Sequence, residues 1–252
     1  MSNTAEIHLD SSVVLSEAFE NKRYQSRIKK LFNEIDRYHL DCFVTQTIVD
    51  ECKNRIKKLR TFLEDTLSEL YFKIKIAKGQ NPIDMQQADL DKSDYQLIMK
   101  FFSDKTLQLG VLNETEKERL EYLETYIIKE MDSAVLPNKT YPAESLLGKI
   151  ASELGIFWGN VEQRLYIRIN RLISSYPDHS YILDLQKRIP TISNTYDLRV
   201  LGEISKRRQQ TQKLTVWVTL DYRELISNSS AIMKETGVIC CDPLYVRLYL
   251  GR

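Results

Sequence analysis

The stretch that decides the fold reads Asn194-Thr-Tyr-Asp197-Leu-Arg-Val-Leu-Gly-Glu-Ile and, after a basic and polar run, Leu214-Thr-Val-Trp-Val-Thr-Leu-Asp221-Tyr-Arg-Glu. Apolar residues recur with helical spacing after Asp197, which places this carboxylate at a helix N-terminus, where negative charge is favoured. The run from Leu214 to Leu220 is short and rich in β-branched residues, which predicts a strand ending just before Asp221. Taken alone, a helix cap and a turn residue are the simpler interpretations of the two aspartates.

The composition is that of an ordinary soluble globular protein. The chain has 252 residues, 42% of them hydrophobic and 28% charged, with a formal net charge of +1. This charge excludes a strongly basic nucleic-acid coat but allows a local basic patch. No apolar run approaches the roughly 20 residues of a membrane span, and the polar N-terminus lacks the apolar region of a signal peptide. The four cysteines show no Cys-x-x-Cys spacing, so we expect reduced thiols, no structural zinc and a cytoplasmic location.

The two ends of the chain alternate between strand and helix patterns. Short apolar runs at 6–10 and 39–45 predict strands, and helical spacing follows each of them. Another strand is expected at 237–241, and residues 191–192 are a further short strand candidate. Strands that alternate with helices predict right-handed crossovers and a parallel sheet.

The middle of the chain has a different pattern. From about residue 61 to residue 188, helical spacing is interrupted by proline and glycine breaks, and there is almost no strand signal. We therefore expect a core domain formed by residues 1–60 and 188–252, with a large all-helical insertion or cap at 61–187.

Four acidic residues fall at equivalent places in this pattern. Asp10 follows the first strand, Glu51 lies early in the helix after the second, Asp197 begins a helix, and Asp221 follows the penultimate strand. Side chains at these places meet at one edge of a parallel sheet, where four carboxylates repel one another. Mg²⁺ or Mn²⁺ relieves this repulsion, prefers oxygen ligands, and supports phosphodiester hydrolysis.

The order and spacing of these segments resemble the PIN-domain family of metal-dependent nucleases. The resemblance covers roughly 5–60 and 188–250. It rests on Leu9-Asp-Ser-Ser, Val44-Thr-Gln-Thr-Ile-Val-Asp-Glu, Asp197-Leu-Arg-Val-Leu-Gly-Glu-Ile, Trp217-Val-Thr-Leu-Asp-Tyr-Arg-Glu-Leu and the trailing Gly237-Val-Ile-Cys-Cys-Asp-Pro. The central helical block departs from the small toxin-type members, which run almost directly from the glutamate helix to the third acid.

The resemblance implies a three-layer α/β/α core with a parallel sheet of about five strands. It implies that Asp10, Glu51, Asp197 and Asp221 are the metal ligands and catalytic residues of an Mg²⁺- or Mn²⁺-dependent endoribonuclease acting on RNA. The hydroxyls of Ser12 and Thr219 match positions that often support the carboxylates. Oligomerisation and an inhibitory protein partner are left open, and no membrane partner is expected.

Other charged residues near these positions allow two interpretations. Glu224 either assists a second metal ion or is a solvated helix charge, and Glu203 is also near the expected site. Asp50 replaces Glu51 if the helix register is shifted by one, because adjacent helical residues point about 100° apart. Basic residues form candidate RNA contacts, although a solvated helix face is the simpler interpretation of any single cluster. These residues are Lys53, Arg55, Lys57, Lys206, Arg207 and Arg208.

Two other function classes compete with a nuclease. A phosphatase with Asp10 as its nucleophile predicts an Asp-x-Asp motif, but Asp10 is followed by Ser-Ser-Val. A PIN-like scaffold that binds RNA or protein without cleavage is the second alternative. The presence of all four acidic residues argues against a decayed site. Preference for RNA over DNA rests on the family resemblance alone.

Overall fold

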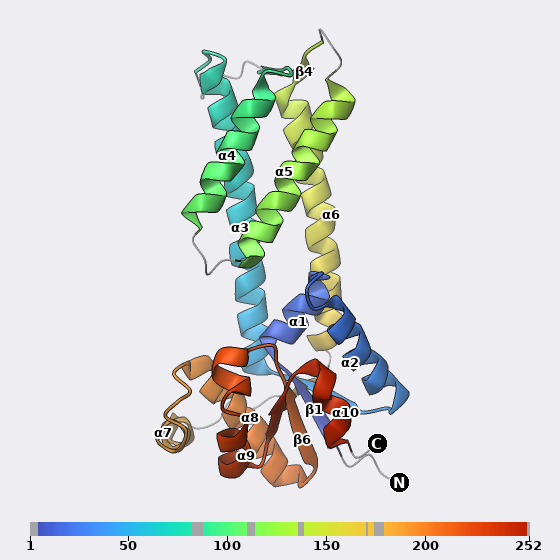
Figure 1. The fold of residues 1–252 in the computed structure, drawn as a ribbon, viewed down its shortest axis with the longest axis vertical. Helices are drawn as coiled ribbons and strands as arrows, with labels where there is room; N and C mark the ends of the chain where they lie inside the picture. The colour runs from blue at the N-terminus through green and yellow to red at the C-terminus, as the bar shows by residue number, and fades with distance from the viewer. Residues whose placement is uncertain are drawn as a thin grey trace. The chain divides into compact units, whose positions relative to one another are not determined.

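The computed structural model describes residues 5–81, 88–109, 114–135, 139–169, 171–173 and 179–250. The chain divides into two compact units (Figure 1). The first contains residues 1–55 and 160–252, and the second contains residues 56–159. Among the described helices, none carries an apolar stretch of membrane-spanning length.

The first unit is built on a parallel sheet with the strand order β5-β2-β1-β6-β7. Every strand pair in this sheet is parallel, and β1 lies at its centre. The mixed α/β fold with a parallel sheet, predicted from the alternating strand and helix patterns, is therefore confirmed. The strands are β1 (Ala5–Leu9), β2 (Asp41–Thr45), β5 (Leu172–Ile173), β6 (Leu214–Val218) and β7 (Ile239–Cys241).

The central strands are covered on both faces. All five residues of β1 are buried, and Val216, Trp217 and Val218 of β6 are inaccessible to solvent. Burial on both faces is typical of parallel sheets and explains the continuous apolar runs in the sequence. Helix α8 packs on β2 and β6, and α9 packs on β7. The helices of this unit include α1 (Ser11–Ala18), α2 (Gln25–Arg37), α7 (His179–Arg188), α8 (Thr195–Thr211), α9 (Ser229–Thr236) and α10 (Val246–Tyr249).

Two local expectations around residue 190 need correction. Residues 191–192 do not form a strand; Ile192 is buried, and its amide donates to the carbonyl of Ile189 in a turn. Helix α8 begins two residues before Asp197, because the Asn194 side chain accepts the Tyr196 amide at 3.0 Å and caps the helix. Asp197 thus lies in the first helical turn instead of opening it.

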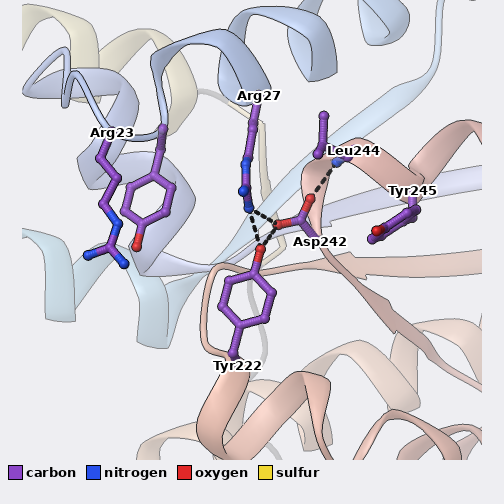
Figure 2. A pocket seen from close by; sticks show the side chains of 7 residues that line it. Arg23, Arg27, Tyr222, Asp242, Leu244 and Tyr245 are labelled. Atoms are coloured by element: carbon purple, nitrogen blue, oxygen red, sulfur yellow. Dashed lines mark hydrogen bonds and ion pairs between the residues drawn. The ribbon is translucent and has the colours of Figure 1, made fainter.

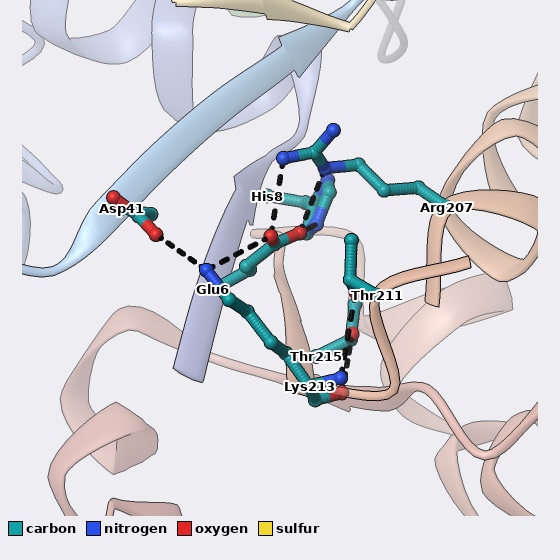
Figure 3. A network of polar contacts seen from close by, with 7 residues as sticks. All are labelled: Glu6, His8, Asp41, Arg207, Thr211, Lys213 and Thr215. Atoms are coloured by element: carbon teal, nitrogen blue, oxygen red, sulfur yellow. Dashed lines mark hydrogen bonds and ion pairs between the residues drawn. The ribbon is translucent and has the colours of Figure 1, made fainter. Parts of the chain in front are cut away.

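The amino-terminal edge of the sheet carries a compensated buried charge (Figure 3). Glu6 in β1 is inaccessible, and its two carboxylate oxygens accept from Nε and Nη2 of Arg207 at 2.8 and 3.1 Å. The Nζ atom of Lys213 lies 3.5 Å from Oε1 of Glu6 and 2.9 Å from Oδ2 of Asp41. Burial raises the pKa of Glu6, but contacts with His8 and Arg207 outweigh it and bring the pKa to about 2. Glu6 is therefore ionised and paired.

The second unit is mainly helical (Figure 1). Its core contains fully buried side chains such as Leu70, Ile74 and Phe102, with Trp158 only 2% exposed. The helices that form it, two of which continue into the first unit, are α3 (Gln46–Ala77), α4 (Asp94–Gln108), α5 (Glu114–Ala134) and α6 (Ala143–Ile169).

The expected all-helical insertion is not wholly helical. Two short segments, β3 (Asp89–Leu90) and β4 (Tyr141–Pro142), form an antiparallel pair. The Ala143 amide extends this pairing by donating to the Ala88 carbonyl at 2.7 Å, so the loops satisfy each other's backbone groups. This compact unit ends at Gly159, whereas the sequence placed the boundary at 187. Strand β5 and helix α7 belong to the first unit, since they pack on β2 and α8.

Candidate functional site

The carboxyl edge of the sheet is where β1 and β6 end side by side. The two strands pair along their whole lengths, with Leu9 opposite Val218. Strand β2 lies on one side of this pair and β7 on the other, so the strand order reverses between β1 and β6. In open α/β sheets this reversal creates a crevice at the carboxyl ends, which is the usual place for a ligand. Asp10 and Asp221 follow the two strands at this point.

Asp10 is held firmly at the end of β1. Its side chain is buried, and Oδ2 accepts from the hydroxyls of Ser12 at 2.5 Å and Thr219 at 3.0 Å. The Ser12 hydroxyl also accepts the Leu220 amide at 3.0 Å, which ties the ends of β1 and β6 together. Burial raises the pKa of Asp10, and the Glu51 carboxylate adds to this, while the two hydroxyls act in the opposite direction. Both hydroxyls expected to support a carboxylate thus contact Asp10.

Asp197 lies in an unfavourable electrostatic environment. It is 9% exposed, and no hydrogen-bond or ion-pair partner for its carboxyl group is found in the described parts of the chain. Burial raises its pKa to about 8, with further contributions from Asp10, Asp221, Glu51 and Glu224, in that order. Raised pKa values are typical of carboxylates that share a site. The structure therefore brings Asp197 within electrostatic reach of the other three predicted ligands.

Glu51 and Asp221 are engaged with protein donors. Glu51 accepts from Arg55 Nη2 at 2.9 Å, one turn along α3. Asp221 caps the π-helical turn Tyr222–Ile226 through the Arg223 and Glu224 amides, at 2.8 and 3.0 Å. Both carboxylates raise the pKa of Asp197, so they lie within electrostatic reach of it.

Two further acids connect the loops around this edge. Glu224 accepts from the Ser193 hydroxyl and from the Asn194 amide at 3.2 Å, which joins the segment before α8 to the segment after β6. Glu203 is 1% exposed and accepts from the Thr47 hydroxyl at the start of α3. Burial raises the pKa of Glu203. In the sequence, Glu203 lies among the apolar residues of a predicted helix, and a glutamate at such a position is rarely buried without a partner.

The alternative ligand Asp50 is oriented elsewhere. Its Oδ1 accepts from Gln46 Nε2 at 2.9 Å, one turn earlier on α3. Glu51 contributes to the raised pKa values of both Asp10 and Asp197. The helix register with Glu51 toward the site is therefore the one that the structure adopts.

The carboxylates gather at this edge without converging on one point. Within the ranges that the structure describes, no three His, Cys, Asp or Glu groups are close enough to hold a metal ion. This edge offers carboxylate and hydroxyl oxygens, which are the donors that Mg²⁺ and Mn²⁺ prefer. Asp197 has no partner among the described residues, and its raised pKa also fits a site that gains from a cation. The residues suit such an ion in chemistry and charge, provided that their side chains rotate inward.

The predicted RNA contacts have different environments. Lys53, Lys57 and Lys206 are exposed, as a phosphate contact requires. Arg55 is paired with Glu51, and Arg207 is paired with the buried Glu6 at the opposite edge of the sheet. Arg207 therefore has a structural partner, and Arg208 is half-buried at the end of α8.

A scan of the chain against models of protein families gives no match, and neither does a search of curated proteins or of solved structures.

Proposed function

We propose that this chain is a PIN-like, Mg²⁺- or Mn²⁺-dependent endoribonuclease. The observation that carries the proposal is the Asp197 carboxyl group, which is almost buried, lacks a protein partner among the described residues, and lies within electrostatic reach of Asp10, Asp221 and Glu51. Such an arrangement costs folding free energy unless a ligand compensates it. Perturbed carboxylates in a crevice are characteristic of functional sites.

In this proposal Asp10, Glu51, Asp197 and Asp221 hold one or two divalent ions. A bound ion would activate a water molecule and offset charge on the phosphate that is attacked. Ser12 and Thr219 fix the Asp10 carboxylate, so its position is set before the ion binds. Asp197, with a pKa of about 8, is mostly protonated at neutral pH, so its engagement requires the release of a proton. Metal affinity should accordingly increase as the pH rises toward 8.

The identity of the substrate is the part of the proposal that rests on the family resemblance. RNA, an inhibitory protein partner and a cytoplasmic location all belong to this inference. The exposed Lys53 and Lys206 lie on helices that carry proposed ligands, and they supply positive charge for a phosphate backbone. We no longer include Arg207 among the proposed RNA contacts, because its guanidinium group forms an ion pair with the buried Glu6.

A scaffold that binds RNA without cleaving it is the second candidate. It is favoured by the finding that no three acidic groups converge among the described residues. In this case Glu51 would keep its ion pair with Arg55, and metal would have no effect. The two candidates differ in whether metal ions produce hydrolysis.

A cleavage assay distinguishes the two. Purified protein is incubated with mixed RNA and single-stranded DNA in Mg²⁺, in Mn²⁺ and in excess chelator. The nuclease proposal expects fragments with either metal and none with chelator, and Asp10→Asn should remove the activity. Fragmentation that survives the chelator would exclude the metal mechanism, and binding without fragments in either metal would favour the scaffold.

A further inference from the structure

A pocket with a volume of about 330 Å³ lies in the first unit, where β6 and β7 end (Figure 2). One wall comes from Arg23, Tyr24 and Arg27, at the start of α2. The opposite wall comes from Tyr222 after β6 and from Tyr245 after β7. Tyr222 directly follows Asp221, so their Cα atoms are about 3.8 Å apart. The pocket therefore begins beside the carboxylate site.

The side chains of this pocket are fixed by a buried carboxylate. Asp242 is 1% exposed, and its Oδ2 accepts from Arg27 Nη1 at 3.0 Å and from the Tyr222 hydroxyl. Its Oδ1 accepts the Leu244 amide at 2.7 Å. Figure 2 shows Arg27 and Tyr222 meeting at this carboxylate from opposite sides. The ring and the guanidinium group are thus held in place before a ligand arrives, which lowers the entropy lost on binding.

The pocket combines planar rings with positive charge. Tyr222 and Tyr245 are 46% and 53% exposed although they line a hollow, so parts of their surfaces are open to a ligand. Arg23 lies with its Cζ 5.3 Å from the centre of the Tyr24 ring. The lining residues include two guanidinium groups, those of Arg23 and Arg27, and Arg27 is paired with the buried Asp242. Aromatic rings beside guanidinium groups are the usual means of binding an unpaired base and its phosphate.

We propose that this pocket binds one nucleotide of a single-stranded RNA, next to the phosphate that reaches the carboxylate site. The base stacks on Tyr245 and Tyr222, and the phosphate contacts Arg23 and Arg27. A base inside a duplex already stacks on its neighbours, so the pocket selects unpaired strands. The choice of RNA and of the neighbouring cleavage site rests on the proposed nuclease function; the stacking pocket itself does not.

The test measures RNA binding separately from cleavage. A fluorescent 12-nucleotide RNA is titrated with protein in excess chelator, and the dissociation constant is read from anisotropy. Tyr245→Ala should raise the dissociation constant by about 5- to 100-fold, which is the usual range for losing one stacked base. Tyr245→Phe keeps the ring and should bind within about twofold of wild type. Tyr122→Ala in α5, whose side chain is 55% exposed, is the matched control and should bind as wild type does.

Arg23 and duplex RNA provide two further comparisons. Arg23→Gln should weaken binding and reduce the dependence of log Kd on log salt by about one unit, as expected for one lost phosphate contact. Binding of the same RNA annealed to its complement should not change in Tyr245→Ala. Circular dichroism of each variant verifies that the fold is retained.

Several results would contradict the proposal that this pocket binds a nucleotide of single-stranded RNA. These are absence of RNA binding by the wild type, an unchanged dissociation constant in Tyr245→Ala, an equal loss on single-stranded and duplex RNA, or competition by a free mononucleotide as strong as by the 12-mer. Cleavage is scored independently. If the wild type cleaves RNA but Tyr245→Ala does not change RNA binding, only the proposed RNA-binding pocket is contradicted. If Tyr245→Ala weakens RNA binding but no metal-dependent cleavage is seen, only the proposed nuclease function is contradicted.

Discussion

The two edges of the parallel sheet place acidic residues in opposite environments. At the amino-terminal edge, Glu6 is completely buried but paired with Arg207 and Lys213, and its pKa is about 2. At the carboxyl edge, Asp197 is slightly exposed, lies within electrostatic reach of other carboxylates, and has a pKa of about 8. Burial alone raises the pKa of both groups, so the difference comes from their partners.

The two edges differ in whether the buried charge has a partner of opposite sign. The bidentate contact between Arg207 and Glu6 satisfies a charge that the fold encloses, and nothing further is required of it. Asp197 and its neighbours form the opposite case, in which the fold maintains a repulsion that no described residue relieves. Substitutions at the amino-terminal edge should therefore lower the stability of the protein. Substitutions at the carboxyl edge should lower its activity instead.

The largest effect is expected on activity at the carboxyl edge. Asp221→Asn keeps the size of the side chain but removes a charge from the proposed metal site. Cleavage should fall by about 10²- to 10⁴-fold, as for loss of a preorganised electrostatic contact. The matched control is Asp41→Asn at the opposite edge, where the rate should stay near that of wild type. Equal rates for wild type and Asp221→Asn at limiting Mg²⁺ would remove Asp221 from the mechanism.

The amino-terminal edge should control stability. Arg207→Ala leaves the buried Glu6 without its main partner and removes the guanidinium group that lies 4.2 Å from the centre of the Phe43 ring. We expect the free energy of unfolding to fall by about 3–5 kcal/mol. Urea denaturation measures this value, with the exposed Lys53→Ala as control. In the double variant Glu6→Gln, Arg207→Ala much of the loss should be recovered; a double variant as unstable as Arg207→Ala would contradict the charge argument.

The third expectation is that pH acts oppositely on the two edges. The raised pKa of Asp197 gives a contribution to stability that is full below the unfolded value of 3.8 and is lost as the pH rises to about 8. Asp197→Asn should therefore stabilise the metal-free protein by a few kcal/mol near pH 9 and change it little near pH 4. For Glu6 the contribution is full above the unfolded value of 4.5 and is lost as the pH falls toward 2.

Urea denaturation at several pH values in chelator measures both trends. Glu6→Gln should destabilise the protein at pH 7, with a smaller effect near pH 2. If the free energies of unfolding of wild type and Asp197→Asn differ by the same amount at every pH, the pKa of Asp197 is not raised by its environment.

The smallest effect is expected from the hydroxyls that orient Asp10. Thr219→Val removes the 3.0 Å hydrogen bond to Asp10 and also the acceptor of the Asp221 amide. Cleavage should fall by about 10- to 100-fold, in the range for residues that orient a metal ligand. Thr125→Val, which alters a helix-surface hydroxyl in α5, should have no effect on rate. A loss in Thr219→Val that matches Asp221→Asn would indicate a disrupted edge and not a misplaced carboxylate.

Local patterns in the sequence were sufficient for β1, β2, β6 and β7, but not for β5, which lies in the stretch predicted to be helical. The β-branched run before Asp221 and the apolar run before Asp10 predict buried parallel strands, and the structure confirms them. Glu51, in the helix after β2, acts electrostatically on Asp10 and Asp197, and its role as a metal ligand stays a prediction. The start of α8 was misplaced, since Asn194 caps the helix before Asp197.

What only the tertiary structure decided was which charges are paired. Arg207 belongs to a basic run that resembles a phosphate-binding face, yet it neutralises Glu6, about 200 residues away in the chain. Asp242, Arg27 and Tyr222 likewise form their pocket through contacts between three distant segments. Periodicity and capping depend on neighbours within a few residues, so they define helices and strand ends. The partner of a buried charge depends on which strands become neighbours, and that is determined only when the sheet assembles.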